Sequence, residues 1–416
     1  MKNIFEKLLN KKSERGQALI MIVFSIVGLI GISALAIDGG NAYIDRRKAE
    51  TAASAAALTA SITRIEGGDW RSAALATAKA NGYNNDGITN IVEMNTPPIS
   101  GPNAGNPEYI QVIITSYLNT FFGPVIGVPQ TINIAQAVSQ SKPAEYGEMF
   151  DGYAIVSLAP HSDCENKIAF EIHGEATIRL DGGGLFVNSD NPDCAFVQYG
   201  SGSVRIQDDS PFSVVGGAKI QKTQLITPYP IQTGAPPIPY PPAFEMPKVG
   251  CGEKIAEVDE LDESVLLPGG WGSENFPPEG VTKLEGGIYC LDGDLILEQG
   301  SKLIGEGVVI VMNKGKIKIS AGAEVQLKGI NGLLIYMPIT NRNLISLNGN
   351  SNSSFSGTIL APGADIRING LNSRSGFHSQ IIGYYIEVDG QSNTLIKYVD
   401  EQNYDAYKMP EVILSQ

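Results

Sequence analysis

The sequence contains few residues of the types on which most enzymes rely for their chemistry. Among 416 residues there are three histidines and four cysteines, and only 18% of the residues are charged. None of the histidines, His161, His173 and His378, lies in a nucleophile or metal-binding signature. No glycine-rich loop stands between a strand and a helix as a phosphate cradle requires. The sequence therefore predicts no catalytic residue, no cofactor site and no metal site.

Positive charge is scarce beyond the N-terminal part of the chain. The net charge is −14, and residues 145–416 hold 18 Lys and Arg against 34 Asp and Glu. An acidic surface repels phosphate backbones, which argues against nucleic acid as a partner. Gly (47) and Pro (24) are plentiful, and they favour many turns and short strands over a helical bundle.

The chain has one long uncharged hydrophobic run, from Ala18 to Ile37. As a helix it rises about 30 Å, which matches the hydrocarbon layer, so residues 17–38 are predicted to be a transmembrane helix. Lys and Arg outnumber Asp and Glu before the run and balance them after it, so residues 1–16 are predicted to be a basic cytoplasmic tail. A cleaved signal peptide is the alternative, but its apolar core is usually shorter.

Residues 39–142 are predicted to form a helical stalk followed by a small α/β unit. The Ala-rich stretch after Asp38 lacks Gly and Pro from Asn41 to Glu66, so the helix should continue until Gly67 and Gly68 end it. A second helix is expected over residues 69–82, with Asp69 as its N-cap. Three strands should follow, at Ile88–Met94, Tyr109–Ser116 and Thr131–Ser139.

A set of short motifs surrounds the hydrophobic run in a fixed order. They are Arg15, Gly16 and Gln17 before it, Asp38, Gly39 and Gly40 at its outer end, then Tyr43, Arg46, Arg47 and an Ala-rich run. This order resembles the N-terminal module of the TadE/TadG-like proteins of Flp-type, tight-adherence pilus assembly. The resemblance implies a single-pass protein of the bacterial cell membrane with an extracytoplasmic C-terminal region. Its expected partners are the lipid bilayer and, as candidates, pilus-assembly proteins.

Residues 150–400 show short alternating strands closed by Gly, Asn and Asp. In five of them the central apolar residue falls at intervals of 21, 28, 21 and 20 residues, at Ile296, Ile317, Ile345, Ile366 and Ile386. A repeat near twenty residues is typical of a right-handed β-helix or a similar β-solenoid, with a β-sandwich as the alternative. The Pro-rich segment 228–247 should interrupt it as a spacer or strap. Residues 401–416 are predicted to be a C-terminal tail. The predicted fold class is mainly β with an N-terminal α anchor.

The four cysteines all lie beyond the predicted membrane span, which favours disulfides. Three pairings are possible, and nearness in the sequence favours Cys164 with Cys194 and Cys251 with Cys290.

The leading functional hypothesis is a non-enzymatic envelope protein whose solenoid presents an interaction surface. The alternative is a carbohydrate-binding or carbohydrate-active protein that uses the outer face of the β-helix. Residues expected on that face are Asp294, Lys316, Lys318, Asp365, Arg367 and Glu387. A solenoid must also show polar residues to water, so fold alone does not decide between the two.

Overall fold

The computed structural model describes residues 14–370, 377–391 and 393–415, and the chain divides into two compact units. Unit 1 comprises Met1–Glu145 and Met409–Gln416, and unit 2 comprises Tyr146–Lys408. Most of the predicted basic tail, residues 1–16, lies outside the described residues. The motif residues Arg15, Gly16 and Gln17 belong to the first turn of α1, and the side chains of Arg15 and Gln17 lie outside the described part of the chain.

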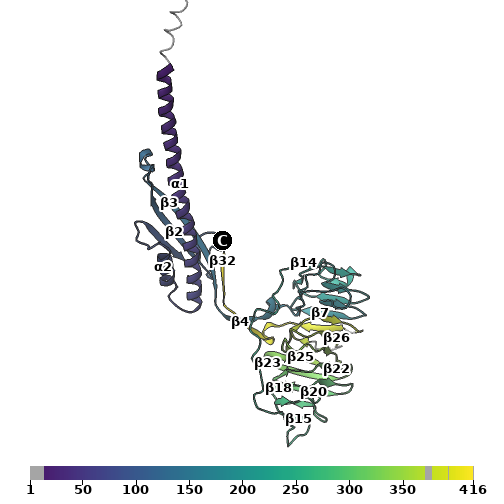
Figure 1. The fold of residues 1–416 in the computed structure, drawn as a ribbon. Coiled ribbons are helices and arrows are strands. Elements are labelled where there is room, and N and C mark those ends of the chain that lie inside the picture. The colour runs from purple at the N-terminus through teal and green to yellow at the C-terminus, as the bar shows by residue number, and fades with distance from the viewer. Residues whose placement is uncertain (1–13, 371–376, 392, 416) are drawn as a thin grey trace, which may run out of the picture. The chain divides into compact units, whose positions relative to one another are not determined.

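Helix α1 (Glu14–Ile65) contains the predicted anchor and continues well beyond it (Figure 1). From Ala18 onward the helix is long and apolar enough to cross a membrane. Large apolar side chains of this part are exposed, such as Phe24 at 72%, which suits lipid better than water. The helix ends near Gly67, as predicted. Gly67 has a φ of +75°, and the N–H of Gly68 bonds to the carbonyl of Thr63 at 2.8 Å.

The C-terminal part of α1 packs against an antiparallel sheet. Six alanines on one side of the helix are fully buried: Ala49, Ala52, Ala53, Ala56, Ala57 and Ala60. Their small side chains let the helix lie close to the sheet, where they join Ile110, Val112 and Ile114 in one core. The predicted stalk is therefore a core element of unit 1.

The sheet of unit 1 has the order β1-β2-β3-β32. Its strands are β1 (Asn90–Asn95), β2 (Tyr109–Asn119), β3 (Gln130–Lys142) and β32 (Glu411–Ser415). The short helix η1 (Gly123–Ile126) lies in the β2–β3 turn. Helix α2 (Trp70–Ala80) begins after Asp69, whose side chain accepts a hydrogen bond from the N–H of Ser72 at 3.2 Å. Ala74 and Ala78 of α2 are buried in the same core.

Strand β32 brings the end of the chain back to unit 1. It pairs antiparallel with β3, with Val412 opposite Ser141 and Leu414 opposite Ser139. The sequence predicted only a tail for residues 401–416. Strand β32 is only five residues long, and the strand that it pairs with lies some 270 positions earlier in the chain, so no local pattern reveals the pairing. Unit 2 is thus an insertion between two neighbouring strands of unit 1.

Unit 2 is a β-solenoid, and within the described residues it contains an 18-stranded and an 8-stranded sheet (Figure 1). The larger sheet consists of β5 (Ile155–Ser157), β7 (Thr177–Asp181), β8 (Leu185–Val187), β10 (Ser203–Ile206), β11 (Phe212–Val214), β13 (Ile226–Thr227), β14 (Gln232–Thr233), β15 (Val265–Leu266), β16 (Gly269–Trp271), β17 (Lys283–Leu284), β18 (Gly287–Leu291), β20 (Lys302–Glu306), β21 (Val308–Met312), β23 (Glu324–Tyr336), β25 (Ser354–Ala361), β27 (Phe377–His378), β28 (Ile381–Gly383) and β30 (Asn393–Lys397). The smaller sheet consists of β6 (Phe170–Ile172), β9 (Phe196–Gln198), β12 (Ala218–Ile220), β19 (Leu295–Leu297), β22 (Ile317–Ile319), β24 (Ile345–Leu347), β26 (Ile366–Ile368) and β29 (Ile386–Val388). Short 3₁₀ segments are η2 (Met149–Gly152), η3 (Thr223–Leu225) and η4 (Asp400–Gln402).

The coils do not stack in the order in which the chain forms them. Strands β28 and β29 of the last coil pair in parallel with β5 and β6 of the first coil. The stack therefore runs from β15 to β30, continues into the first coil and ends near β14. The chain enters and leaves this stack near its middle, where β4 (Glu145–Glu148) pairs with β31 (Asp405–Lys408).

The 8-stranded sheet contributes a continuous column of apolar side chains to the core. Ile317, Ile345, Ile366 and Ile386 occupy it as predicted. The prediction for Ile296 was wrong by one residue, because Leu295 pairs with Ile317 and is 2% exposed. Strand β19 reads Leu-Ile-Leu, so its alternation does not distinguish the inward side from the outward side.

The Pro-rich segment contributes β14 to the larger sheet, and beyond β14 it lies over the outer face of that sheet. Ile238, Tyr240, Phe244 and Met246 pack there against buried residues of β5, β21 and β25. The side chain of Asn188 holds the segment by bonding to both backbone polar groups of Ile238, at 2.7 and 2.9 Å. Those strands are therefore buried on both faces, which explains continuous apolar runs such as β21, Val-Val-Ile-Val-Met.

The predicted fold class is confirmed: a mainly β chain with one long N-terminal helix and a β-solenoid. The described strand pairs within the two large sheets of the solenoid are parallel, whereas the alternative, a β-sandwich, is built from antiparallel strands.

Candidate functional site

Asp38, at the outer end of the predicted span, binds the turn between β2 and β3. Its carboxylate accepts hydrogen bonds from the backbone N–H groups of Phe121, Phe122 and Gly123, at 2.8, 3.0 and 2.9 Å. A carboxylate that receives three N–H donors fixes this turn against α1. Asp38 therefore has a structural partner that the sequence motif did not reveal.

The remaining motif residues after Asp38 lie on the exposed side of α1. Arg46 and Arg47 both pair with Glu50, at 3.2 and 3.1 Å, and Arg47 also lies 3.3 Å from the hydroxyl of Tyr43. Exposed pairs of this kind add little stability. A Cβ built on Gly39 or Gly40 would meet no described atom within 4 Å. Packing within this chain therefore does not explain why glycine stands at these two positions.

Both disulfides favoured by the sequence are present in unit 2. Cys164 bonds to Cys194, and Cys251 bonds to Cys290. The second bond ties the chain that follows the Pro-rich segment to strand β18. Each bond therefore closes one section of the solenoid, and the formal choice among three pairings is resolved.

The polar residues predicted for the outer face of the solenoid engage one another across neighbouring coils. Lys316 lies 3.6 Å from Asp294, Lys318 lies 2.9 Å from Glu298, Lys167 lies 2.7 Å from Asp365, and Arg367 lies 2.7 Å from Glu387. Most of these charged side chains already have a partner of opposite sign. This row of residues therefore resembles the polar exterior of a solenoid more than a set of catalytic groups.

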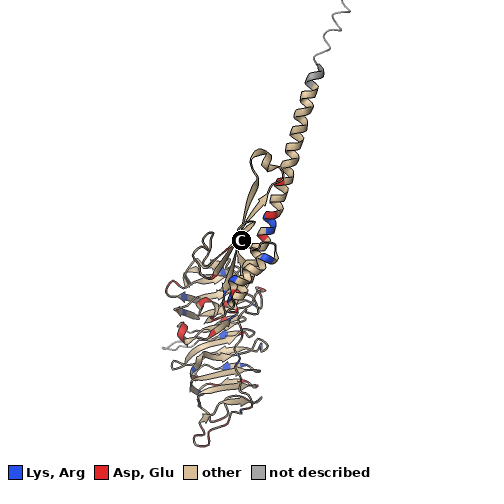
Figure 2. Cartoon of the chain, turned by 90° about the vertical axis from the view of Figure 1, so that its left-hand side faces the viewer, with Lys and Arg blue, Asp and Glu red and all other residues tan. Residues whose placement is uncertain are grey.

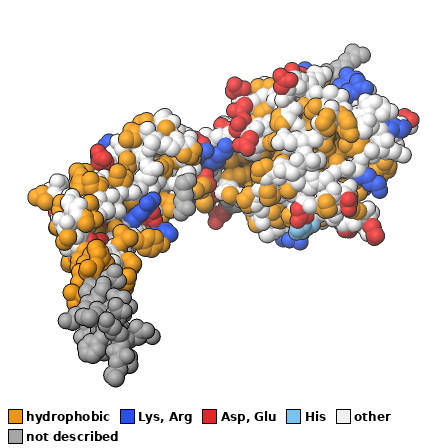
Figure 3. All heavy atoms as spheres, turned by 90° about the horizontal axis from the view of Figure 1, so that it is seen from above, with side chains coloured by type: hydrophobic (Ala, Val, Ile, Leu, Met, Phe, Trp, Pro, Cys, Tyr) orange, Lys and Arg blue, Asp and Glu red, His pale blue; other side chains and the backbone are white. Residues whose placement is uncertain are grey.

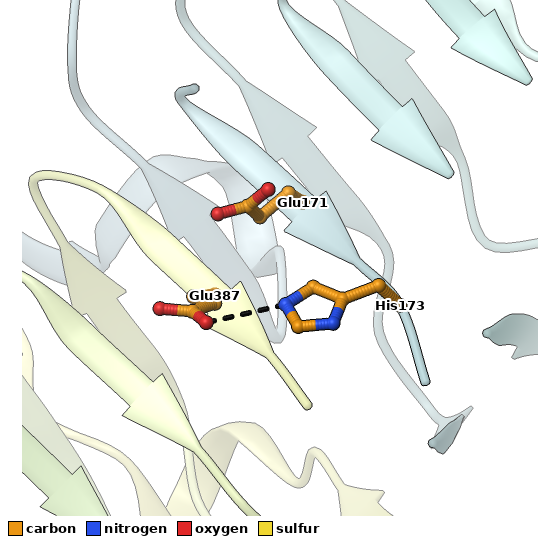
Figure 4. A group of neighbouring side chains, drawn as sticks. All are labelled: Glu171, His173 and Glu387. Carbon is orange, nitrogen blue, oxygen red and sulfur yellow. Dashed lines mark hydrogen bonds and ion pairs between the residues drawn. The ribbon is translucent and has the colours of Figure 1, made fainter. Parts of the chain in front are cut away.

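One cluster on this face is more buried than the other ion pairs, because the side chains of His173 and Glu387 are only 17% and 25% exposed. Glu171 of β6 and Glu387 of β29 face each other on neighbouring strands, and His173 follows Glu171 by two positions on the same side (Figure 4). The Nε2 atom of His173 lies 3.2 Å from Glu387, and its Nδ1 atom lies 3.2 Å from Asp389. The ring of Tyr199 stacks on the imidazole with a centroid distance of 4.8 Å.

The cluster concentrates negative charge. Burial and then the charge of Glu387 raise the pKa of the Glu171 carboxyl above its ordinary value. One ligand atom each from Glu171, His173 and Glu387 lie within 4.8 Å of one another, so these three residues could hold a divalent cation. In that state Asp389 would accept a hydrogen bond from the Nδ1–H group of His173 and orient the ring, as second-shell carboxylates do. With both ring nitrogens protonated, the same geometry is a network of ion pairs.

Sequence reasoning did not find this cluster. The signal was the spacing Glu171-x-His173, which places both side chains on one face of a strand. Glu387 stands directly after Ile386, a residue of the predicted column, so its outward direction was predicted. Its nearness to Glu171 was not, because the last coil packs on the first.

Comparisons with known proteins bear on the N-terminal part of the chain. The family model described as "Putative Flp pilus-assembly TadE/G-like" matches residues 16–63. No curated protein and no solved structure matches the chain. The match includes Asp38, Gly39, Gly40, Tyr43, Arg46 and Arg47, and the solenoid lies beyond it. Residues 16–63, the hydrophobic helix with its Ala-rich continuation, are therefore a TadE/G-like module related to Flp pilus assembly.

Proposed function

We propose that this chain is a single-pass envelope protein that works with a Flp-type pilus-assembly apparatus. Helix α1 anchors it, residues 1–16 lie in the cytoplasm, and the solenoid outside the cytoplasm presents a non-enzymatic interaction surface. The observation that carries the proposal is the family match over residues 16–63, which coincides with the one helix of the described chain able to span a membrane.

Two further observations support the orientation. Basic residues exceed acidic ones before the span, as is usual on the cytoplasmic side. Both disulfides lie in unit 2, and disulfides persist in oxidising compartments outside the cytoplasm. The ion pairs on the outer face of the solenoid favour a surface for binding over one for catalysis.

Protease digestion of intact spheroplasts tests the orientation. We expect an externally added protease to degrade unit 2 and to leave a protected N-terminal fragment that contains the span. Protection of unit 2, with cleavage only after lysis, would contradict the proposed topology.

Co-purification tests the link to pilus assembly. The full-length chain, solubilised from the membrane, should retain membrane components of the pilus-assembly apparatus, and a strain without this chain should assemble fewer pili. A variant that lacks residues 146–408 is the matched control, because it keeps the TadE/G-like module. Normal piliation without this chain, together with no retained component, would refute the proposal.

A second candidate function, carbohydrate binding, is favoured by the cluster around His173. Tyr199 is 43% exposed and could stack on a sugar ring, beside the paired carboxylates Glu171 and Glu387. A glycan array and a polysaccharide-turnover assay should then give signals that Glu171→Gln with Glu387→Gln abolishes. The control is Glu298→Gln, at an ion pair elsewhere on unit 2. No binding and no turnover by the unaltered chain would remove this candidate.

A further inference from the structure

The turn between β2 and β3 is strongly apolar for an exposed loop. Residues 121–128 read Phe-Phe-Gly-Pro-Val-Ile-Gly-Val, and the chain has no charged residue between Glu108 and Lys142. Phe121, Val125 and Ile126 are 73%, 86% and 81% exposed. A cluster of large exposed apolar side chains marks a contact with a partner or a membrane. We name residues 121–128 the apolar tip.

The apolar tip lies alongside the predicted membrane span, within unit 1. It shares a groove of about 520 Å³ with Val27, Ile30, Ala34 and Leu35 of α1. Ile30 lies eight residues before Asp38, which is roughly 12 Å along the helix axis toward the cytoplasmic end. Figures 1 and 2 show the hairpin tip beside α1, and Figure 2 shows an uncharged stretch of α1 at the height of the tip. Figure 3 shows hydrophobic side chains gathered on this part of unit 1.

Many polar backbone groups of the apolar tip have hydrogen-bond partners within unit 1, as a segment in hydrocarbon requires. In hydrocarbon, an unpaired N–H group is costly, so irregular backbone needs internal partners. Asp38 accepts three N–H groups of the tip, and Thr120 donates its hydroxyl to the carbonyl of Val128 at 2.6 Å. Further N–H groups bond to carbonyls within the turn, those of Thr120, Val125, Gly127 and Val128. Pro124 and Pro129 have no N–H group.

We propose that the apolar tip inserts into the outer leaflet of the same bilayer that α1 spans, with lipid acyl chains filling the groove between them. Asp38 then acts as a clamp at the membrane surface, because it holds the tip against the helix. The groove is open on the side of α1: a Cβ built on Gly31 or Gly39 would meet no described atom within 4 Å. Unit 1 is accordingly held to the membrane at two points, which restricts its rotation about the helix.

Site-specific labelling in lipid nanodiscs tests this insertion. All four native cysteines form disulfides, so an introduced thiol can be labelled selectively with an environment-sensitive fluorophore. Ile126→Cys reports on the tip. Ile99→Cys is the matched control, since Ile99 is also apolar and 69% exposed but lies in the β1–β2 connection, at the opposite end of β2.

We expect the label at position 126 to be quenched by doxyl lipids and to be at least about fivefold less accessible to iodide than the label at 99, because the hydrocarbon layer excludes ions. Equal iodide quenching at both positions would overturn the proposal. Protection from both quenchers at position 126 would overturn it too, since a protein would then occupy the groove. Asp38→Ala should increase the iodide quenching of the label at position 126 and leave the quenching of the label at position 99 unchanged.

The inference rests on the proposed anchoring by α1, and a third label separates the two. Ile26→Cys lies within the span and should be quenched by doxyl lipids whether or not the tip inserts. Loss of that signal would count against the anchor itself, whereas a normal signal at 26 with an iodide-accessible label at 126 would count against the tip alone.

Discussion

Glu171 and Glu387 place two like charges on neighbouring strands, and only part of this charge is balanced. Arg367 binds Glu387, while Glu171 has no ion pair among the described contacts. When both carboxyl groups are ionised, their repulsion therefore destabilises the folded state. It is the kind of local conflict that functional sites often retain.

The pH dependence of stability should reveal this conflict. Because burial and Glu387 raise the pKa of Glu171, the folded state binds the proton more tightly than the unfolded state. Stability from this group is present at low pH and is lost as the pH rises from the ordinary carboxyl value through the raised one. Glu171→Gln should therefore raise the free energy of unfolding of unit 2 at pH 7, by at most about 1 kcal/mol, and have no effect near pH 4.

Glu298 provides a contrast with the opposite sign. Hydrogen bonds from Lys318 and Ser320 lower the pKa of its carboxyl, so its ionised form favours folding. Glu298→Gln should lower the stability slightly at pH 7 and not at pH 3. Denaturant titrations of both variants across this pH range provide the measurement. A loss of stability for Glu171→Gln at pH 7 would contradict our account of the cluster.

Individual residues were predictable where their chemistry is local. Asp69 as an N-cap, Gly67 as a helix end and the nearest-neighbour pairing of the cysteines all depend on short sequence distances. Asp38 was recognised as a motif residue, but its role as an acceptor for the β2–β3 turn depends on contacts about 85 positions away. No spacing rule connects those two segments.

At the scale of elements, the Pro-rich segment acts as a strap that two features hold in place. Asn188 fixes it near Ile238, and the disulfide between Cys251 and Cys290 fixes the chain beyond it, with 39 positions between the two cysteines. Proline favours this arrangement because it has no N–H group, so the part of the segment beyond β14 can cover the sheet with few backbone hydrogen bonds to it.

Removing the second disulfide should loosen the strap. Cys251→Ser with Cys290→Ser should lower the free energy of unfolding of unit 2 by about 2–4 kcal/mol, because it frees a long loop. Limited proteolysis should then cut between residues 230 and 264 at lower protease concentration. Cys164→Ser with Cys194→Ser, which removes a disulfide with a separation of 30, is the control. Equal cleavage in the strap for both double variants would show that the disulfide does not hold it.

Strand β32 should stabilise unit 1 although it is only five residues long. A chain that ends at Pro410 leaves backbone groups of Gln140 and Lys142 without their ladder partners and exposes the packing site of Leu414. We expect a loss of at least about 2 kcal/mol and faster amide hydrogen exchange in residues 138–142. Ile413→Ser, which changes an exposed side chain and keeps the strand, should leave exchange there unchanged. Unaltered exchange in the truncated chain would contradict the pairing.

The types of the elements were largely predictable, and their partners less so. Alternation and glycine turns identified the solenoid strands, but Ile296 was misplaced because both of its neighbours are also apolar. The long apolar N-terminal helix was predicted from length and hydropathy alone. The strand at residues 411–415 was missed because a single short strand gives no periodic signal.

At the scale of the whole molecule, unit 2 is an insertion with closely spaced ends. We expect replacement of residues 146–408 by a short Gly-Ser linker to leave unit 1 folded, because all four strands of its sheet remain. Hydrogen exchange at Ile110, Val112 and Ile114 should match that of the full chain in the same detergent. Rapid exchange at these buried positions would show that unit 1 depends on the solenoid.

The order of the coils could not be predicted from the sequence. A repeat of about twenty residues predicts stacking of consecutive coils, and most coils obey it. The exception is the last coil, which packs on the first coil of the sequence. The first coil therefore lies in the middle of the stack and not at its end. The strap makes this possible, since it carries the chain from one end of the stack to the other.

The entry and exit of the chain near the middle of the stack also determine how unit 2 bears a mechanical load. A partner that pulls on the solenoid, while the anchor holds the other end, strains two covalent crossings at once, at residues 145–146 and 408–409. The tension enters at a coil that has neighbours on both sides. Neither terminal coil is peeled away, so the solenoid should withstand a pull that would unravel one attached by its first or last coil.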